Sequence, residues 1–494
     1  MYGEEKSDSL IVAAKQANNP KGAESVERRS GAKGNAEQPH MRRTQSRESM
    51  SQRLSRVREA AKQRKKERFT ALFHLLTVEA LEAAFLSLSR KAAAGVDGIR
   101  WMDYAGNMKN NITDLHRRLH QGSYRAQPGR RHYIPKADGK QRPLGIASLE
   151  DKIVQYALVK ILNAVYENDF MGFSYGFRPG RSQHDALDAL ATGLVRTNVN
   201  WVLDADISQF FDRVSHEWLI RFTEHRIGDR RVIRLIRKWL TAGTSEEGQW
   251  RATEEGTPQG AVISPLLANI YLHYVFDLWA HQWRRRHATG NVVMVRYADD
   301  IVIGFDKRID AQCFRIAMQR RLKEFGLTVH PKKTRLMEFG RFAAENRASR
   351  GKGKPETFNF LGFTHISGKD RSGRFMLIRK TRRDRMTATL KAIKDGLRKR
   401  WHYSIPEQGK WLRRVVQGYL NYHSVPGNYP MMRKFRIYVT DLWRRALRRR
   451  SQQDDTTWTK ANRLAAVWLP KVRVLHPWPV ERFTARHPRQ EPGA

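Results

Sequence analysis

Residues 291–305 read NVVMVRYADDIVIGF. Two apolar runs rich in β-branched residues flank the tetrapeptide Tyr297-Ala298-Asp299-Asp300, and this pattern predicts a β-hairpin with two adjacent carboxylates at its tip. Two negative charges about 4 Å apart repel by roughly 4 kcal/mol at an effective dielectric constant of about 20. The pair is therefore costly unless a cation neutralises it, and a divalent metal is the natural choice. For the tetrapeptide alone, an ordinary charged turn is the alternative.

A second acidic stretch, residues 201–212, reads WVLDADISQFFD. On a strand, successive side chains alternate, so Asp204 and Asp206 share one face while an apolar set occupies the other. Such a strand beside the predicted hairpin gives a site of three carboxylates. Oxygen ligands suit Mg²⁺, and two such ions can activate a 3′-hydroxyl and stabilise a leaving pyrophosphate. Asp204 competes with Asp206 for the metal, and a nuclease could use the same carboxylates.

Composition points to a polyanionic partner. The 494 residues include 92 Lys+Arg and 49 Asp+Glu, a net charge of +43, and 40% are hydrophobic, enough for real cores. The segment 376–450 is expected to be helical, and its basic residues are interleaved with aromatic ones. This composition suits RNA binding; the alternative is that the aromatic side chains are core.

A single cysteine excludes a disulfide framework within the chain. With no signal-like N-terminus and no long apolar run, a cytoplasmic, bacterial-type intracellular protein is expected.

Further motifs surround the acidic stretches: GTPQG at 256–260, SYGFRPGRS at 174–182 and FLGF at 360–363. Together with YADD they resemble the motifs of group II intron-encoded reverse transcriptases/maturases, and the likeness runs from about Ala80 to the C-terminus. The resemblance implies an α+β fold: a right-hand polymerase whose fingers and palm carry an antiparallel sheet, followed by a helical thumb/maturase domain. It implies an RNA-directed DNA polymerase that also binds its intron RNA and assists splicing and mobility.

Five parts are expected along the chain. They are a flexible basic leader at 1–66, fingers at 67–195, a palm with the catalytic aspartates at 196–370, a helical thumb/maturase domain that binds RNA at 371–455, and a basic DNA-binding extension at 456–494. Many relatives continue into an endonuclease domain with paired cysteines. This sequence has none, so it is not expected to cleave a second DNA strand itself, and its primer is expected to come from elsewhere.

The resemblance also assigns roles to residues. The catalytic residues are Asp206, Asp299 and Asp300, and two Mg²⁺ ions are assigned to Asp206, Ile207, Asp299 and Asp300. Deoxynucleoside triphosphates are assigned to Lys136, Arg142, Phe211, Gln259 and Lys333.

Three of these nucleotide-binding residues have more specific roles. Phe211 stands at the spacing of a gate against the ribose 2′-hydroxyl, and Lys333 is placed to protonate the leaving pyrophosphate. In the fingers hairpin, phosphate contact by Lys136 and Arg142 together requires a loop that pairs these two residues across the strands.

The RNA-binding set comprises Arg178, Arg181, Arg413, Arg414, Arg433 and Lys434, although Arg178 and Arg181 could instead support the palm. The expected partners are group II intron RNA, a DNA target and primer, and deoxynucleotides; no membrane is expected, and a homodimer stays open. Two other functions remain: a splicing cofactor without polymerase activity, and the reverse transcriptase of another retroelement.

Overall fold

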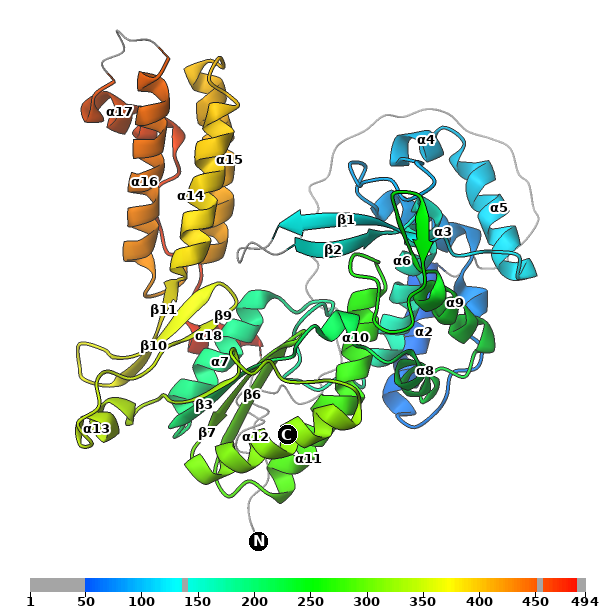
Figure 1. Ribbon diagram of the computed structural model, residues 1–494, viewed down its shortest axis with the longest axis horizontal. Helices are drawn as coiled ribbons and strands as arrows, with labels where there is room; N and C mark the ends of the chain where they lie inside the picture. Colours follow the sequence, from blue (N-terminus) through cyan, green and yellow to red (C-terminus); the bar gives the residue numbers. More distant parts are fainter. Residues whose placement is uncertain (1–48, 136–140, 451–455, 487–494) are drawn as a thin grey trace, which may run out of the picture.

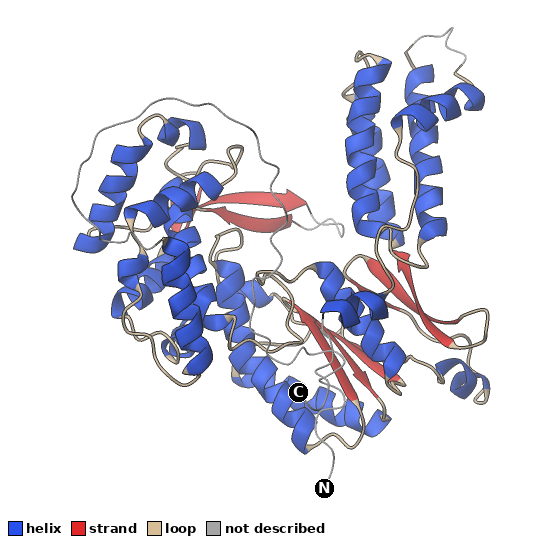
Figure 2. Cartoon of the chain, turned by 180° about the vertical axis from the view of Figure 1, so that it is seen from behind, coloured by secondary structure: helices blue, strands red, loops and turns tan. Residues whose placement is uncertain are grey.

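A four-stranded antiparallel sheet forms the centre of the fold, in the order β6-β7-β3-β8. The computed structural model describes residues 49–135, 141–450 and 456–486 (Figure 1). The strands of this palm sheet are β3 (Trp201–Asp206), β6 (Val292–Tyr297), β7 (Asp300–Phe305) and β8 (Arg335–Glu338). Figure 2 shows these strands enclosed by helices.

Alternation along the strands assigns their side chains to two cores. Val202 and Val293 join the core that contains α7 (Gln183–Arg196), whereas Leu203 and Met294 join the core that contains α12 (Arg308–Glu324). Both faces of the sheet are therefore covered by helices. The acidic residues lie at one end of the strands, which leaves them at the edge of the packed layers.

The fingers combine helices with a small sheet of order β2-β1-β4-β5. The strands are β1 (Gly129–Pro135), β2 (Gln141–Ile146), β4 (Thr244–Glu246) and β5 (Gln249–Arg251). The helices of this half are α2 (Met50–Gln63), η1 (Phe73–Leu75), α3 (Val78–Ser87), α4 (Trp101–Ala105), α5 (Met108–Gln121), α6 (Leu149–Tyr166), α8 (His216–Glu224) and α9 (Arg230–Thr241). The β1–β2 hairpin projects from these helices toward the side where the thumb stands (Figure 1).

Helix α2 corrects the expectation of a flexible leader as far as residue 66. Met50, Leu54, Val57 and Ala61 recur at helical spacing and pack into the fingers core, and Ala61 is fully buried. A capping box at Ser49 and Gln52 closes the N-terminus of the helix. The high Arg and Lys content of this segment hid a narrow apolar stripe. Residues 1–48 lie outside the described residues.

The segments that link fingers, palm and thumb complete the fold. They are η2 (Phe210–Asp212), α10 (Ser264–Leu272), the π-helical turn η3 (His273–Asp277), α11 (Leu278–Arg286), α13 (Ala343–Ala348), β9 (Phe358–Phe360), β10 (Phe363–Lys369) and β11 (Phe375–Thr381). Strands β9 to β11 form a second antiparallel sheet at the base of the thumb.

The thumb is a bundle of α14 (Arg383–Arg398), α15 (Ile405–His423) and α16 (Tyr429–Arg448), with α17 (Trp458–Trp468) packed at its far end (Figure 1). The chain then returns, and α18 (Pro479–Arg486) packs on α7 of the palm. The α+β class with antiparallel sheets is confirmed, as is the helical nature of the segment after β11. Among the described residues, no helix is long and apolar enough to span a membrane.

Candidate active site

The β6–β7 hairpin places two carboxylates at its tip. Tyr297 pairs with Asp300, so Ala298 and Asp299 form a two-residue loop. Ala298 has φ +55°, and a positive φ at the first loop residue matches the right-handed twist of the flanking strands. Asp299 is half-buried and Asp300 is exposed. The predicted hairpin is confirmed, and its turn is held in a backbone conformation that a non-glycine residue adopts at a cost.

Strand β3 brings the third carboxylate to the same end of the sheet. Asp206 lies directly opposite Asp300, a cross-strand arrangement that puts the two side chains on one face. Asp204 lies two residues further into the strand on that face, opposite Val302 and Arg335. The sheet register therefore gathers Asp206, Asp299 and Asp300 at one edge, with Asp204 behind them.

The electrostatics of this edge favour a bound cation. The pKa of Asp300 is raised to about 7, because protein atoms displace water from it and because the charge of Asp299 adds to the effect, followed by those of Asp206 and Asp204. Burial likewise raises the pKa of Asp204 to about 6 and that of Asp299 above its usual value. Because each ionised carboxylate is penalised here, a positive charge that neutralises them stabilises the site.

An oxygen-only donor set of this kind fits a hard divalent metal. In the described ranges, no three His, Cys, Asp or Glu side chains already converge as a metal-binding group. The Asp206 carboxylate accepts a hydrogen bond from Lys333, with 2.5 Å between Nζ and Oδ2. Ile207 has a buried side chain in the core, so its main-chain carbonyl oxygen is the group it can offer to a metal.

The loop at 256–260 packs against both η2 and the fingers. Thr257 N donates to Phe211 O at 2.7 Å, and Gln259 Nε2 donates to Asp212 Oδ1 at 2.9 Å. Gly260 has φ +109°, and a Cβ there would lie 3.0 Å from Gly145 O of β2. The structure thus brings Phe211, which is half-buried against Phe210, together with Gln259.

The fingers hairpin has a register that differs from the predicted one. Pro135 pairs with Gln141, and Arg142 lies opposite Ile134, so the expected pairing of Lys136 with Arg142 is wrong. Strand pairing continues to Pro135, which leaves residues 136–140 between the last paired positions. Lys136 itself lies outside the described residues. Arg142 is exposed and its charge counteracts the raised pKa of Asp299, which places it on the side of the carboxylates.

Two of the predicted RNA-binding arginines make contacts within the protein. The Arg178 side chain is 2% exposed, pairs with Glu167 at 2.9 Å, and donates to the carbonyls of Met171 and Ser174 at 2.8 Å. Arg181 donates to Gly172 O and lies against the ring of Tyr175. Both guanidinium groups are used to fix the turn that precedes α7. These contacts favour the alternative that both arginines support the palm, and RNA binding by either stays a prediction.

A buried network beneath the hairpin was not foreseen. Arg296 is fully buried, forms an ion pair with Asp277 at 2.5 Å, and donates to Ala298 O at 3.0 Å. It also donates to Asn269 Oδ1 and Ser174 Oγ, at 3.1 and 2.7 Å. The one signal in the sequence was an arginine inside the apolar run VVMVRY, because a buried guanidinium needs a partner. Nothing in the sequence pointed to Asp277 as that partner.

The four remaining predicted RNA-binding residues are exposed on the thumb, namely Arg413, Arg414, Arg433 and Lys434. Arg413 also donates to the carbonyls of Val467 and Trp468 at the end of α17. The aromatic residues of the thumb fit both alternatives, a core role and an RNA-binding role. Trp443 and Tyr419 are core, whereas Tyr429 and Tyr438 are exposed.

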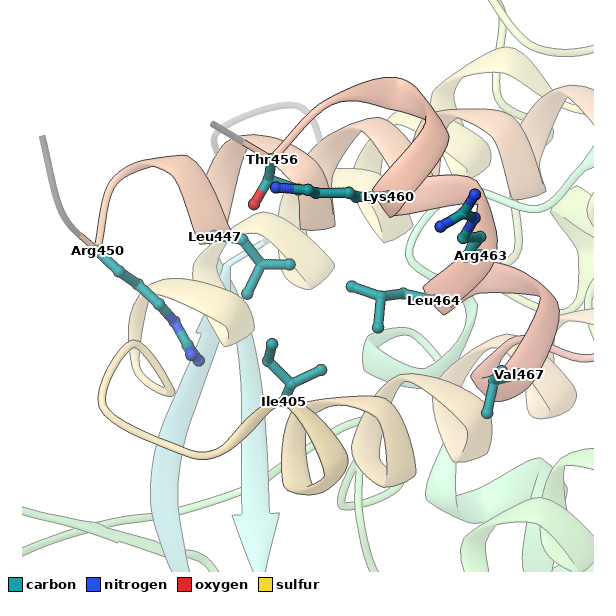
Figure 3. Close-up of a pocket in the computed structure, with 8 residues that line it drawn as sticks. All are labelled: Ile405, Leu447, Arg450, Thr456, Lys460, Arg463, Leu464 and Val467. Atoms are coloured by element: carbon teal, nitrogen blue, oxygen red, sulfur yellow. The ribbon is translucent and has the colours of Figure 1, made fainter. Parts of the chain in front are cut away.

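A cavity of about 400 Å³ lies between α15, α16 and α17 at the far end of the thumb (Figure 3). Four aliphatic side chains, three cations and one threonine line it, namely Ile405, Leu447, Leu464, Val467, Arg450, Lys460, Arg463 and Thr456. It is separated from the catalytic end of the palm by the length of the bundle (Figure 1), so it is no part of the carboxylate site.

The C-terminal extension uses some of its basic residues within the protein. Arg482 and Arg379 both pair with the buried Asp188, and Arg486 pairs with Asp185. Phe483 is buried in the same core as α7. Arg482 and Arg486 thus hold α18 on the palm, and the predicted DNA contact of the extension stays a prediction for its other residues.

Comparison with known proteins agrees with this geometry. Residues 134–365 match the family model described as reverse transcriptase (RNA-dependent DNA polymerase). Protein YkfC of Escherichia coli is 42% identical over 206 residues, which are 41% of this chain and 54% of that protein. The group II intron-encoded protein LtrA of Lactococcus lactis is 38% identical over 222 residues, 44% of this chain and 37% of that protein. The chain thus matches about half or less of the length of these curated relatives.

A palm sheet with carboxylates at one edge, faced by a fingers hairpin and a helical thumb, is the architecture of right-hand polymerases, and residues 134–365 form a reverse transcriptase domain. Enzymes of this family use divalent metal ions. The chain is also similar to part of a group II intron-encoded protein, and this similarity lies in the region that contains the reverse transcriptase domain.

Proposed function

We propose that the protein is an RNA-directed DNA polymerase that copies RNA into DNA with two Mg²⁺ ions. The observation that carries the proposal is the position of Asp206, Asp299 and Asp300 at one edge of the palm sheet, where the pKa of Asp300 is raised to about 7. Two divalent ions held there would ease deprotonation of the primer 3′-hydroxyl and neutralise the departing pyrophosphate.

The side chains around the edge have separate tasks. Arg142 on the fingers hairpin faces the triphosphate, and Lys333, already paired with Asp206, is placed to return a proton to the pyrophosphate. Contacts of the 256–260 loop join Gln259 to the segment that carries Phe211. These two residues line the nucleotide site opposite Arg142 and Lys333. The Phe211 ring excludes a ribose 2′-hydroxyl, so deoxynucleotides are the substrates.

The second part of the proposal concerns the intron RNA. The exposed cations Arg414, Arg433 and Lys434 on the thumb provide contacts to phosphates, and the protein stabilises the folded intron during splicing. The folded intron performs the chemistry of splicing, so this role does not need the aspartates. Mobility of the intron then requires that the spliced intron RNA, its DNA target and a primer are bound together at the palm.

Primer extension tests the polymerase activity. On a poly(A) template with an oligo(dT) primer, we expect Mg²⁺-dependent DNA synthesis by the wild type and none by Asp299→Asn/Asp300→Asn. The variant should still bind structured RNA. A folded wild type that binds RNA tightly but makes no DNA would favour the splicing cofactor without polymerase activity.

Splicing assays test the RNA role separately. The Asp299→Asn/Asp300→Asn variant should still promote splicing of the cognate intron, whereas alanine at Arg414, Arg433 and Lys434 should weaken it. Splicing that survives the thumb changes unaltered would favour the reverse transcriptase of another retroelement.

A further inference from the structure

Phe177 combines two features that are unfavourable for a side chain with no function. Its ring is 53% exposed, and its backbone has φ +57°, a left-handed conformation that is a genuine outlier for a bulky residue. Glycine adopts this conformation freely, and a polar residue would be better solvated at the surface. Backbone outliers of this kind concentrate at functional sites.

The residues on either side force Phe177 into this conformation. The backbone of Gly176 lies so close to the catalytic turn that a Cβ on it would be 2.3 Å from Ala298 N. Asn269 donates to Gly176 O at 2.7 Å, which fixes this contact. On the other side, Arg178 is locked by Glu167 and by two main-chain carbonyls. The turn is therefore pinned at both ends, and the ring between them is directed to the surface.

The exposed ring lies beside the catalytic hairpin. The centroids of Phe177 and Tyr297 are 6.3 Å apart at an interplanar angle of 46°. Tyr297 is half-buried and pairs with Asp300, so the two rings form an apolar ledge next to the carboxylates. In the proposed reaction, the primer 3′ end must come to rest at those carboxylates.

We propose that the Phe177 ring packs against the base pairs at the primer end of the RNA–DNA duplex. The inference rests on the proposed polymerase function and adds a substrate contact to it. An aromatic face suits this task because it contacts any base or sugar, whatever the sequence being copied. The pinned turn keeps the ring exposed in the absence of the duplex, so no ordering cost arises when the duplex binds.

Binding and stability together test the proposal. Phe177→Gly removes the ring and relieves the backbone, so this variant should be as heat-stable as the wild type or more so. Its affinity for a fluorescent RNA–DNA primer–template should nevertheless fall about 10-fold, as expected for the loss of one aromatic contact to a base. Phe177→Trp should keep wild-type affinity. A purely structural ring would instead make Phe177→Gly less stable and leave duplex affinity unchanged.

A matched control exists in the fingers. Glu247 also has a positive φ, +50°, at an exposed turn between β4 and β5. Glu247→Gly relieves the same kind of backbone strain away from the carboxylates, and we expect it to leave duplex affinity unchanged. A loss of affinity equal to that of Phe177→Gly would overturn the proposal, because strain relief alone would then account for the effect.

A scan of abasic sites locates the contact. Primers with a single abasic position at successive distances from the 3′ end are compared between the wild type and Phe177→Gly. An abasic position within the first two base pairs should cost Phe177→Gly less affinity than it costs the wild type, because the wild-type ring cannot stack on a missing base. Further from the 3′ end, the loss of affinity from the abasic position and the loss from the substitution should be additive. Additive losses at every position would overturn the proposal.

The outcomes separate this contact from the polymerase assignment. If the wild type binds the duplex but makes no DNA, the proposed polymerase activity fails, and binding still decides the contact. If the wild type makes DNA and Phe177→Gly binds and extends equally well, the contact fails and the polymerase assignment stands. A wild type that neither binds the duplex nor extends it would overturn both.

Discussion

The palm and the thumb use charged side chains in opposite ways. At the palm, Arg296 and Asp277 are fully buried, and their hydrogen bonds hold the catalytic turn in one geometry. On the thumb, Arg433 and Lys434 stand exposed on the surface of α16. The buried pair fixes the position of the turn, whereas the exposed cations contribute positive charge that attracts phosphates. Motifs that look equally basic in the sequence therefore carry different functions, as the buried Arg178 shows.

The largest expected effect comes from the carboxylates of the palm. Asp206→Asn should lower DNA synthesis by about 10³-fold or more, because one of the charges that hold the metal ions is lost. RNA affinity should stay unchanged, since the thumb is not altered. Primer extension and filter binding on the same preparation measure both. Synthesis retained in Asp206→Asn but lost in Asp204→Asn would move the metal site by two residues along β3, to Asp204.

The buried pair under the hairpin should give the next largest effect. Arg296→Met leaves Asp277 buried without its partner, so the free energy of unfolding should fall by about 3–5 kcal/mol. Urea titration measures this change. The double variant Arg296→Met/Asp277→Leu should recover much of the loss, because neither charge then remains. Arg433→Met on the thumb is the matched control, and an equal loss there would contradict the contrast between the two regions.

Acid should weaken the joint between palm and thumb. His365 of β10 is fully buried, and burial followed by the charge of Arg379 lowers its pKa to about 3. Because its pKa in the unfolded chain is higher, the neutral ring stabilises the fold above about pH 6.5, and this stability is lost as the pH falls. Between pH 7 and pH 5 the contribution is about 2 kcal/mol, and His365→Phe should remove that part of the pH dependence. Thermal unfolding at both pH values tests this, and an unaltered pH dependence in the variant would contradict it.

The exposed cations of the thumb should give the smallest effect for each residue. Arg433→Ala/Lys434→Ala should weaken binding to structured RNA by about 5- to 10-fold and reduce the slope of log affinity against log salt by roughly 1.4. Protein stability should not change. The matched control is Arg234→Ala/Arg237→Ala on α9, which removes the same charge from an exposed face of the fingers. An equal loss of affinity in the control would mean that RNA binding depends on net charge alone.

Much of the candidate site followed from local sequence patterns. The alternation in residues 201–206 and the polar break in residues 291–305 predicted the strands and the hairpin, because strand side chains alternate whatever the distant context. The helical thumb followed from its apolar periodicity in the same way.

Other parts depended on distant contacts, which no local pattern contains. Arg178 was assigned to RNA because its charge was visible and its burial against Glu167 was not. The fingers hairpin was predicted in the wrong register, because the residues between its strands fit several loop lengths. Helix α2 was missed since its basic residues outnumber the apolar stripe that packs on the core.

The π-helical turn at His273–Asp277 sets the phase of a long helix. A π turn holds one residue more than an α turn, so every side chain that follows it is rotated about the helix axis relative to a regular α-helix. Deleting one residue from this turn would allow an uninterrupted α-helix of ordinary propensity, and Asp277 would then point about 100° away from Arg296. The geometry of the catalytic turn thus depends on an extra residue in a helix that lies outside the three carboxylates. We expect that shortening this helix by one residue would abolish the proposed polymerase activity and leave the sequence motifs intact.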